Sequence, residues 1–395
     1  MDFELNETQQ MIANTAREIG AEFSPEYWRK KEEKGEFPAE FWKAICSAGF
    51  LGIVIPEEYG GSGGGATELF IAMEKLAAHG CGMAGAWFMV LSEVFGALSI
   101  LKHGTAEQKQ KYLPGLAKGD IEFSMALTEP NAGTNTLNVS TTARKEGNHW
   151  IINGNKTFIS GADRANGMLI IARTSPCGSA GSKTSGLSLF LADLPNKAIE
   201  VSPIAKHGVN YSHSCNVTFS DLKLPDSALM PPADGGWHNV LDTLNPERMS
   251  FTAVGIGIAN LAITKAVEYS HERKVFNGVP IGSYQSLQFP LAESYSCLEA
   301  ARLLNFRAST AYDCGRPSSE VGAYANMAKA IVVEHATKAV YWAMQVFGGY
   351  GYAVEYDVER WWREVNLIRL APVTQQMTLA YIGERVMGMP KSYQV

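Results

Sequence analysis

The stretch ALTEPNAGT, from Ala126 to Thr134, stands where the pattern of the chain changes. Before it, residues 6–119 carry apolar side chains at spacings of three and four, the period of a helix with one buried face. After it, the residues up to 229 form short runs typical of strands, separated by turn signals such as Asn153-Gly154. The helical period returns after Pro231-Pro232 and continues to the end. The quoted stretch therefore lies near the start of a β region between two helical regions.

This order predicts an α+β multidomain fold for the 395 residues. We expect an N-terminal α-helical domain at residues 1–120, a middle antiparallel β-sandwich or barrel at residues 121–232, and a C-terminal four-helix bundle at residues 233–395. The clearest strand signals are residues 123–127, 149–152, 168–172, 187–191 and 215–219, and the small, polar residues 178–185 are expected to form a surface loop.

The composition excludes several classes of protein. The formal net charge is −6, and the 34 basic residues are scattered among acidic and apolar ones, so nucleic acid is not an expected partner. Six cysteines without a CxxC pair favour free, mostly buried thiols over a metal site or a disulfide framework. The first residues, MDFELNETQQ, do not resemble a secretion signal, and the apolar stretches fall short of the ~20 residues that span a bilayer. We therefore expect a cytoplasmic protein without membrane insertion.

Residues 126–134 directly follow a predicted strand and resemble the ALTEPxAGSD motif of the acyl-CoA dehydrogenase family. Together with three later motifs in the same order, the resemblance covers about residues 3–388. It implies an FAD site that includes Leu127, Thr128, Gly133 and Thr134, with close backbone approach at the glycine and hydroxyl donors from the threonines. Taken alone, the stretch is also compatible with an ordinary strand and turn.

The second motif, INGNKTFIS at residues 152–160, is similar to the family's INGxKxWIT. The resemblance implies a hairpin in which Phe158 lies against the isoalloxazine ring and the Ser160 hydroxyl bonds the ring edge near N5. Phe158 keeps the flat apolar surface of the usual tryptophan but has no indole N–H. A common Asn-Gly hairpin with a core phenylalanine is the alternative.

The third and fourth motifs lie in the C-terminal region. RKVFNGVPIGSYQ at residues 273–285 resembles RxxFGxxIxxFQ with one added residue, and QVFGGYGY at residues 345–352 resembles QxxGGxGY. In the family both reach the FAD of a neighbouring subunit, which implies at least a homodimer and usually a tetramer. The positions concerned are Arg273, Phe276, Gln285, Gln345, Gly348 and Gly349, and Thr374 and Gln376 also match positions that contact FAD.

The catalytic base is not where many relatives carry it. Their late IYEGTxE segment corresponds here to residues 370–376, with Pro372 at the glutamate position, and proline also lacks the N–H that polarises the thioester carbonyl in the family. The isovaleryl- and long-chain-type branches place the glutamate just before an arginine, as in Glu247-Arg248 here. We expect Glu247 to be the base and Arg248 and Asn245 to contact substrate. The alternative is that Glu247 and Arg248 are a solvated helix pair.

The resemblance implies FAD-dependent α,β-dehydrogenation of an acyl-CoA, or of an acyl-carrier thioester, to the trans-2-enoyl thioester. The base removes the α-proton, the β-hydrogen leaves as hydride to flavin N5, and an electron-transfer flavoprotein accepts the electrons. Alternatives on the same fold are a flavin monooxygenase or oxidase, an enoyl-thioester reductase, and a non-catalytic thioester-binding protein. Asn210 stands where many relatives have arginine.

Overall fold

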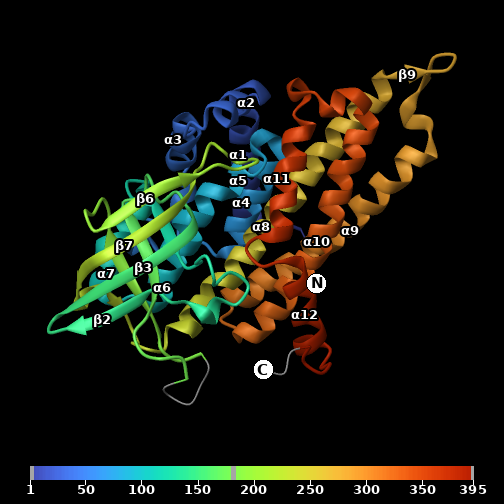
Figure 1. Ribbon diagram of the computed structural model, residues 1–395. Coiled ribbons are helices and arrows are strands. Elements are labelled where there is room, and N and C mark those ends of the chain that lie inside the picture. The colour runs from blue at the N-terminus through green and yellow to red at the C-terminus, as the bar shows by residue number, and fades with distance from the viewer. Residues whose placement is uncertain (1–3, 179–183, 393–395) are drawn as a thin grey trace.

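The computed structural model describes residues 4–178 and 184–392, so most of the surface loop expected at residues 178–185 lies outside the described residues. The N-terminal helices lie between the β region and the C-terminal helices (Figure 1). The predicted order of a helical, a β and a second helical region is confirmed. The boundaries that we propose, after residues 120 and 232, fall between elements.

The N-terminal helices begin and end where the sequence supplies caps. The Asn6 side chain accepts a hydrogen bond from the Gln9 N–H at 2.9 Å before the first helix, and the last helix ends at Gly119, whose φ is 76°. The elements are α1 (Glu7–Glu22), α2 (Pro25–Lys34), α3 (Ala39–Ser47), α4 (Ala66–Leu76), α5 (Ala84–Met89), α6 (Ser99–His103) and α7 (Ala106–Lys118), with π-helical segments η3 (Ala77–Cys81) and η4 (Val90–Leu98).

The β region is one mixed sheet in which most neighbours are antiparallel. Its strands are β1 (Phe123–Ala126), β2 (Thr142–Glu146), β3 (His149–Ser160), β4 (Gly167–Arg173), β5 (Leu187–Asp193), β6 (Ile199–Ile204), β7 (Ser214–Pro225) and β8 (Leu229–Met230). They pair in the order β6-β7-β3-β2-β4-β5-β8, and β1 joins β4 in parallel. The all-antiparallel expectation therefore needs one correction at β4, which pairs in parallel with both β1 and β2.

The turn expected at Asn153-Gly154 is wrong, and so is the hairpin that the resemblance implied there. Strand β3 runs through both residues, with a change of register against β7 between Ile152 and Gly154. Gly154 has a φ of 152°, and a Cβ on it would lie 2.4 Å from the Thr141 hydroxyl oxygen. Glycine is required here by the close approach of a neighbouring residue at an irregular point of the strand, not by a reversal of the chain.

The C-terminal region contains the predicted long helices and one that the sequence reading did not assign. The unpredicted helix is α11 (Val358–Leu370). The others are α8 (Gly236–Glu272), α9 (Gln285–Asp313), α10 (Ser318–Phe347) and α12 (Gln375–Tyr381). A two-stranded hairpin, β9 (Lys274–Val275) and β10 (Val279–Pro280), joins α8 to α9. It projects from the end of the bundle opposite the sheet (Figure 1).

Two hydrophobic clusters fill the interior, one inside the β region and a larger one that runs through both helical regions and one side of the sheet. Two helical stretches, residues 84–103 and 236–272, are long and apolar enough to span a membrane, which the sequence reading did not anticipate. The most apolar windows of these stretches are 89% and 78% buried inside the protein, so both are core helices here.

The cysteines only partly follow expectation. Cys46, Cys81, Cys215, Cys297 and Cys314 are free thiols, but of the six cysteines only Cys81 and Cys215 are buried, and Cys177 and Cys314 are exposed. Among the described residues, no group of three or more His, Cys, Asp or Glu side chains is arranged to hold a metal ion.

Candidate functional site

A buried lysine joins the first two motifs. The Lys156 ammonium, on β3, donates to the Leu127 carbonyl and to Glu129 Oε1, each at 2.9 Å. The Thr157 N–H donates to the Thr128 carbonyl at 2.9 Å. The loop after β1 is therefore fixed against β3, and the sequence-predicted residues Leu127 and Thr128 lie beside the strand that carries Phe158 and Ser160.

The Glu129–Lys156 ion pair is charged and shielded from water. Burial raises the pKa of Glu129, but Lys156 and hydrogen bonds from Thr141 and Ser140 outweigh it and bring the pKa to about 2. Burial lowers the pKa of Lys156 to about 8, and Glu129 opposes that shift. Since each charge offsets the burial of the other, the pair acts as a rigid joint between the two motifs.

Phe158 does not belong to the core, which contradicts the alternative reading of the second motif. Its side chain is 63% exposed and its φ is 58°, a rare conformation for a residue other than glycine. Ser160 follows two residues later and is half-buried. Gly133 has open space on its Cβ side, and Thr134 is exposed. An exposed aromatic ring on a strained backbone, on a strand joined to a loop that carries hydroxyls and an open glycine, fits a flat, polar-edged group such as a flavin.

Glu247 lies on α8 and is buried, with 9% of its surface exposed. Within the described part of the chain, no hydrogen bond or ion pair holds its carboxylate. Burial raises the pKa of Glu247 to about 7, although Arg248 and Lys329 act in the opposite direction. Because the residue is buried, the alternative of a solvated helix pair is excluded.

Arg248 and Asn245 form the next part of the site. The Arg248 Nη1 donates to Asn245 Oδ1 at 2.9 Å, and Asn245 Nδ2 donates to the Ser318 carbonyl and hydroxyl at the start of α10. Burial lowers the pKa of Arg248, and its Nε has no partner among the described residues. The arginine is thus oriented on one side and keeps an unused donor on the other.

Lys329, on α10, is a residue that the sequence reading missed. It is fully buried, and its ammonium donates to the Ala371 carbonyl at 3.3 Å and to the Val373 carbonyl. These two carbonyls flank Pro372, the position that replaces the late glutamate. No sequence signal pairs a lysine in the middle of a helix with a turn more than forty residues later.

Thr374 and Gln376 follow this turn at the start of α12. The Thr374 hydroxyl caps the helix by accepting from the Met377 N–H at 3.3 Å, and Gln376 is exposed. Both residues therefore stand one turn or less from the Pro372 segment.

The remaining predicted residues lie at the other end of the bundle. Arg273 ends α8, 26 residues after Glu247, which corresponds to roughly 40 Å along a helix. The ring of Phe347, which precedes Gly348, stacks on Tyr269 near the same end of α8, with centroids 4.4 Å apart. The structure does not bring this group to Glu247 within one chain, and all its members are exposed: Arg273, Phe276, Gln285, Gln345, Gly348 and Gly349.

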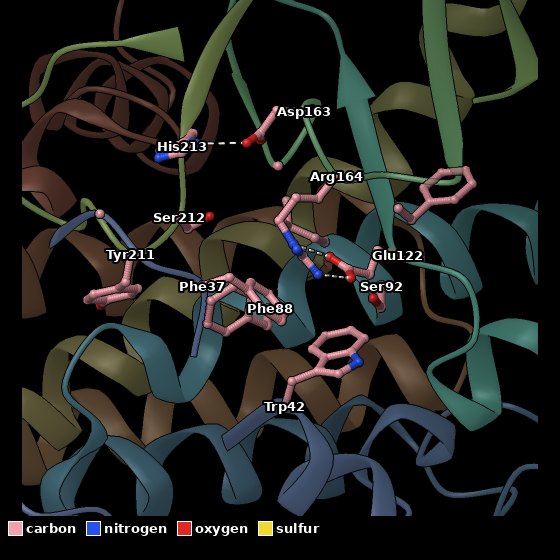
Figure 2. A pocket seen from close by; sticks show the side chains of 14 residues that line it. Phe37, Trp42, Phe88, Ser92, Glu122, Asp163, Arg164, Tyr211, Ser212 and His213 are labelled. Atoms are coloured by element: carbon pink, nitrogen blue, oxygen red, sulfur yellow. Dashed lines mark hydrogen bonds and ion pairs between the residues drawn. The ribbon is translucent and has the colours of Figure 1, made fainter. Parts of the chain in front are cut away.

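A separate cleft between the N-terminal helices and the sheet does not contain the predicted residues (Figure 2). Figure 2 shows Arg164 directed at Glu122 and His213 at Asp163, and these contacts of 2.6 and 2.7 Å give each of the four side chains a partner within the protein. The cleft volume of about 30 Å³ is enough for one or two water molecules but not for an acyl-CoA.

Comparison with known proteins gives the same picture along the whole chain. Residues 6–120, 124–222 and 234–387 match the N-terminal, middle and C-terminal domains of acyl-CoA dehydrogenase. An acyl-CoA dehydrogenase of Mycobacterium tuberculosis is 36% identical over 98% of each chain. The CarC subunit of the caffeyl-CoA reductase-Etf complex of Acetobacterium woodii is 33% identical over 94% of this chain and 96% of its own.

Among solved structures, the glutaryl-coenzyme A dehydrogenase in its glutaryl-CoA complex is 30% identical, covers 100% of this chain and 98% of its own, and has a TM-score of 0.93. The three domain matches and these similarities show that the chain is an oxidoreductase that belongs to the acyl-CoA dehydrogenase family, whose members bind FAD.

Proposed function

We propose that the protein catalyses α,β-dehydrogenation of an acyl-CoA, with Glu247 as the base that removes the α-proton. The observation that carries this proposal is a buried carboxyl without a partner, on the long helix that passes the sheet. Pro372 supports it, because the late position has no carboxylate to compete for the role.

The environment of Glu247 suits proton abstraction from a weak carbon acid. A base works best when its pKa lies near the working pH, and burial has brought the pKa of Glu247 to about 7. Bound FAD supplies the acceptor for the β-hydride. The nearby positive charges of Arg248 and Lys329 favour negative charge on the substrate as the proton leaves.

Polarisation of the thioester carbonyl requires a donor other than residue 372. The Pro372 nitrogen has no hydrogen, whereas the Val373 N–H has no acceptor among the described residues. We assign this N–H to the thioester oxygen, and Arg248 and Asn245 to substrate contacts at the same site.

The FAD site is assigned to two chains. Leu127, Thr128, Gly133, Thr134, Phe158, Ser160, Thr374 and Gln376 would contact the cofactor in their own subunit, and Arg273, Phe276, Gln285, Gln345, Gly348 and Gly349 would contact the cofactor of a neighbour. Support comes from the separation along α8 and from large apolar side chains exposed at the far end, including Phe276 at 81% and Tyr352 at 84%. A homo-oligomer, which we propose to be a tetramer, would cover them.

An electron-transfer flavoprotein is the proposed electron acceptor, because the similar protein from Acetobacterium woodii is a subunit of a reductase-Etf complex. The same similarity favours a second candidate, reduction of an enoyl-CoA. Glu247 suits that direction as well, since a carboxyl with a pKa of about 7 can return a proton to the α-carbon.

Anaerobic mixing with straight, branched and cyclic acyl-CoAs tests the proposal, with flavin absorbance as the readout and Glu247→Gln alongside. Bleaching of the wild-type flavin by one substrate class, lost in the variant, is the expected result. Reoxidation of the reduced protein by enoyl-CoA without bleaching by any acyl-CoA would support the reductase. No spectral change with any thioester in either direction would contradict both.

A further inference from the structure

Lys329 is an unusual residue for the middle of a buried helix. It is 0% exposed, and its ammonium donates to the carbonyls of Ala371 and Val373, on either side of Pro372. Gln375 Nε2 donates to the Ala330 carbonyl at 3.1 Å, next to Lys329 on α10. Two adjacent residues of α10 thus hold the turn that leads into α12.

The position of this ammonium is also electrostatically significant. Lys329 and Glu247 act on each other across the interface of α8 and α10, and Arg248 acts on both. Tyr381 of α12 acts on Arg248. About one helical turn to either side of Glu247 on α8, Thr243 bonds Ser99 of α6 at 2.8 Å and Phe251 packs against Trp87 of α5.

A purely structural role would not require a charge. A buried lysine is costly because its ammonium loses water, and burial together with Arg248 lowers the pKa of Lys329 to about 7, with Glu247 opposing. A neutral donor could bond the carbonyl oxygens of the turn with a smaller desolvation cost than a buried ammonium. The lysine is therefore best explained by the effect of its charge on Glu247, across the packed helices α8 and α10.

We propose that Lys329 is a positioning residue of the active site, which fixes the turn around Pro372 and, through its charge, favours the ionised form of Glu247. This inference rests on the proposed role of Glu247 as the base. It links two features that distinguish this site, because the Lys329 ammonium bonds the carbonyls on either side of Pro372 and its charge acts on Glu247. Because two buried groups titrate together, the pH dependence belongs to the Glu247–Lys329 pair.

The test is an infrared pH titration of the Glu247 carboxyl, with its band identified by subtraction of Glu247→Gln. In Lys329→Met the carboxyl should ionise at a pH at least one unit higher than in wild type. Lys338→Met is the matched control, because Lys338 lies on the same helix in an exposed ion pair with Glu293 and should leave the titration unchanged. This measurement needs no turnover, so it remains decisive even if the proposed reaction is wrong.

The kinetic counterpart is the pH profile of flavin reduction by the substrate found for wild type. Lys329→Met should lose about tenfold in kcat/KM near pH 7. The part of the loss that is due to incomplete ionisation of Glu247 should disappear at high pH. The part that is due to displacement of the turn around Pro372 should remain. Should Lys329→Met fail to fold, Lys329→Gln keeps a donor for one carbonyl and is expected to show the same shift. A carboxyl titration within 0.3 units of wild type in the folded variant would overturn the proposal.

Discussion

Two buried glutamates of this protein show how local partners decide what a carboxyl can do. Burial raises the pKa of Glu93 to about 8 and that of Glu247 to about 7. Glu93 accepts a hydrogen bond from the Ile53 N–H at 3.2 Å, and this bond stabilises the segment before α4. Glu247 has no such partner among the described residues, and this leaves its carboxylate available for a substrate proton.

The raised pKa of Glu247 predicts a stability penalty that depends on pH. The folded-state pKa of about 7 lies above the ordinary value of 4.5, so the folded protein binds the extra proton between these values and loses stability as the pH rises through them. Glu247→Gln should therefore raise unfolding stability by on the order of 2–3 kcal/mol near pH 8 and by little near pH 4. Denaturant unfolding at pH 4 and pH 8 measures this gain in stability. An equal gain at both pH values would contradict a raised pKa for Glu247.

At the level of single residues, the sequence pointed to Glu247 as the proposed base but not to its surroundings. Glu247 was predictable because Pro372 removes the competing position and an arginine follows the glutamate. Lys329 was not, because its role depends on α10 lying beside residues 371–373, which are distant in sequence. The partner of Asn210 was equally hidden: its N–H donates to Glu32 at 2.7 Å, from a different region of the chain.

Between elements, the Glu129–Lys156 ion pair joins the loop after β1 to β3. We expect this ion pair to affect FAD binding more than other contacts between elements. Glu129→Gln leaves Lys156 buried without a counter-charge, which typically costs 3–5 kcal/mol of unfolding stability. We also expect faster loss of FAD on dilution, because the Leu127–Thr128 carbonyls are held at the same joint. Urea unfolding and FAD release provide the readouts.

Glu122→Gln is the matched control for that experiment. It breaks the partly exposed Glu122–Arg164 pair at the cleft of Figure 2, for which a loss of less than about 1 kcal/mol is expected. Equal losses of unfolding stability in the two variants would contradict a larger contribution from the buried Glu129–Lys156 pair.

The close approach at Gly154 gives a second prediction for the strands. Gly154→Ala forces a Cβ to within 2.4 Å of Thr141 and imposes a φ of 152° on alanine, so a loss of about 1–3 kcal/mol is expected. Gly147→Ala, at a φ of 60° with open space around it, should cost less. Comparison of their denaturation midpoints separates steric contact from backbone strain, and a smaller loss at Gly154 would contradict the crowding.

The elements that sequence patterns missed share a physical cause. Strand β2 reads TARKE and exposes four of its five residues, and β6 reads IEVSPI and has no fully buried residue, so neither shows a run of buried residues. The Asn-Gly pair in β3 has the composition of a turn, but contact with Thr141, which no local pattern records, explains its glycine. Long apolar helices such as α8 were predictable because their burial repeats along many turns.

On the scale of the whole molecule, one carboxylate joins the three regions. Glu32 of α2 accepts from the Asn210 N–H at 2.7 Å in the β region and from Arg363 Nη1 at 2.9 Å on α11. Rigid placement of the sheet against α8 is needed if Phe158 and Glu247 are to act on one substrate, and this contact contributes to it.

The proposed two-chain FAD site predicts complementation between inactive variants. Arg273→Ala should lose FAD at every site, and Glu247→Gln should keep FAD but lose the base. In oligomers reassembled from both, some sites would combine Glu247 of one chain with Arg273 of the other, so flavin bleaching by substrate should reappear. Absence of activity in mixtures shown by mass analysis to contain both chains would contradict the cross-subunit assignment.

The central claim, that Glu247 removes the α-proton, is tested most directly by exchange of the α-hydrogens of a 3-thia-acyl-CoA in deuterated water, followed by NMR. Sulfur replaces the β-carbon, so proton removal is isolated from hydride transfer. We predict that Glu247→Gln lowers the exchange rate at least about a hundredfold relative to wild type. Glu93→Gln is the control: it also removes a buried carboxyl, and it should exchange at the wild-type rate. Exchange at the wild-type rate in FAD-loaded Glu247→Gln would contradict the claim and place the base elsewhere.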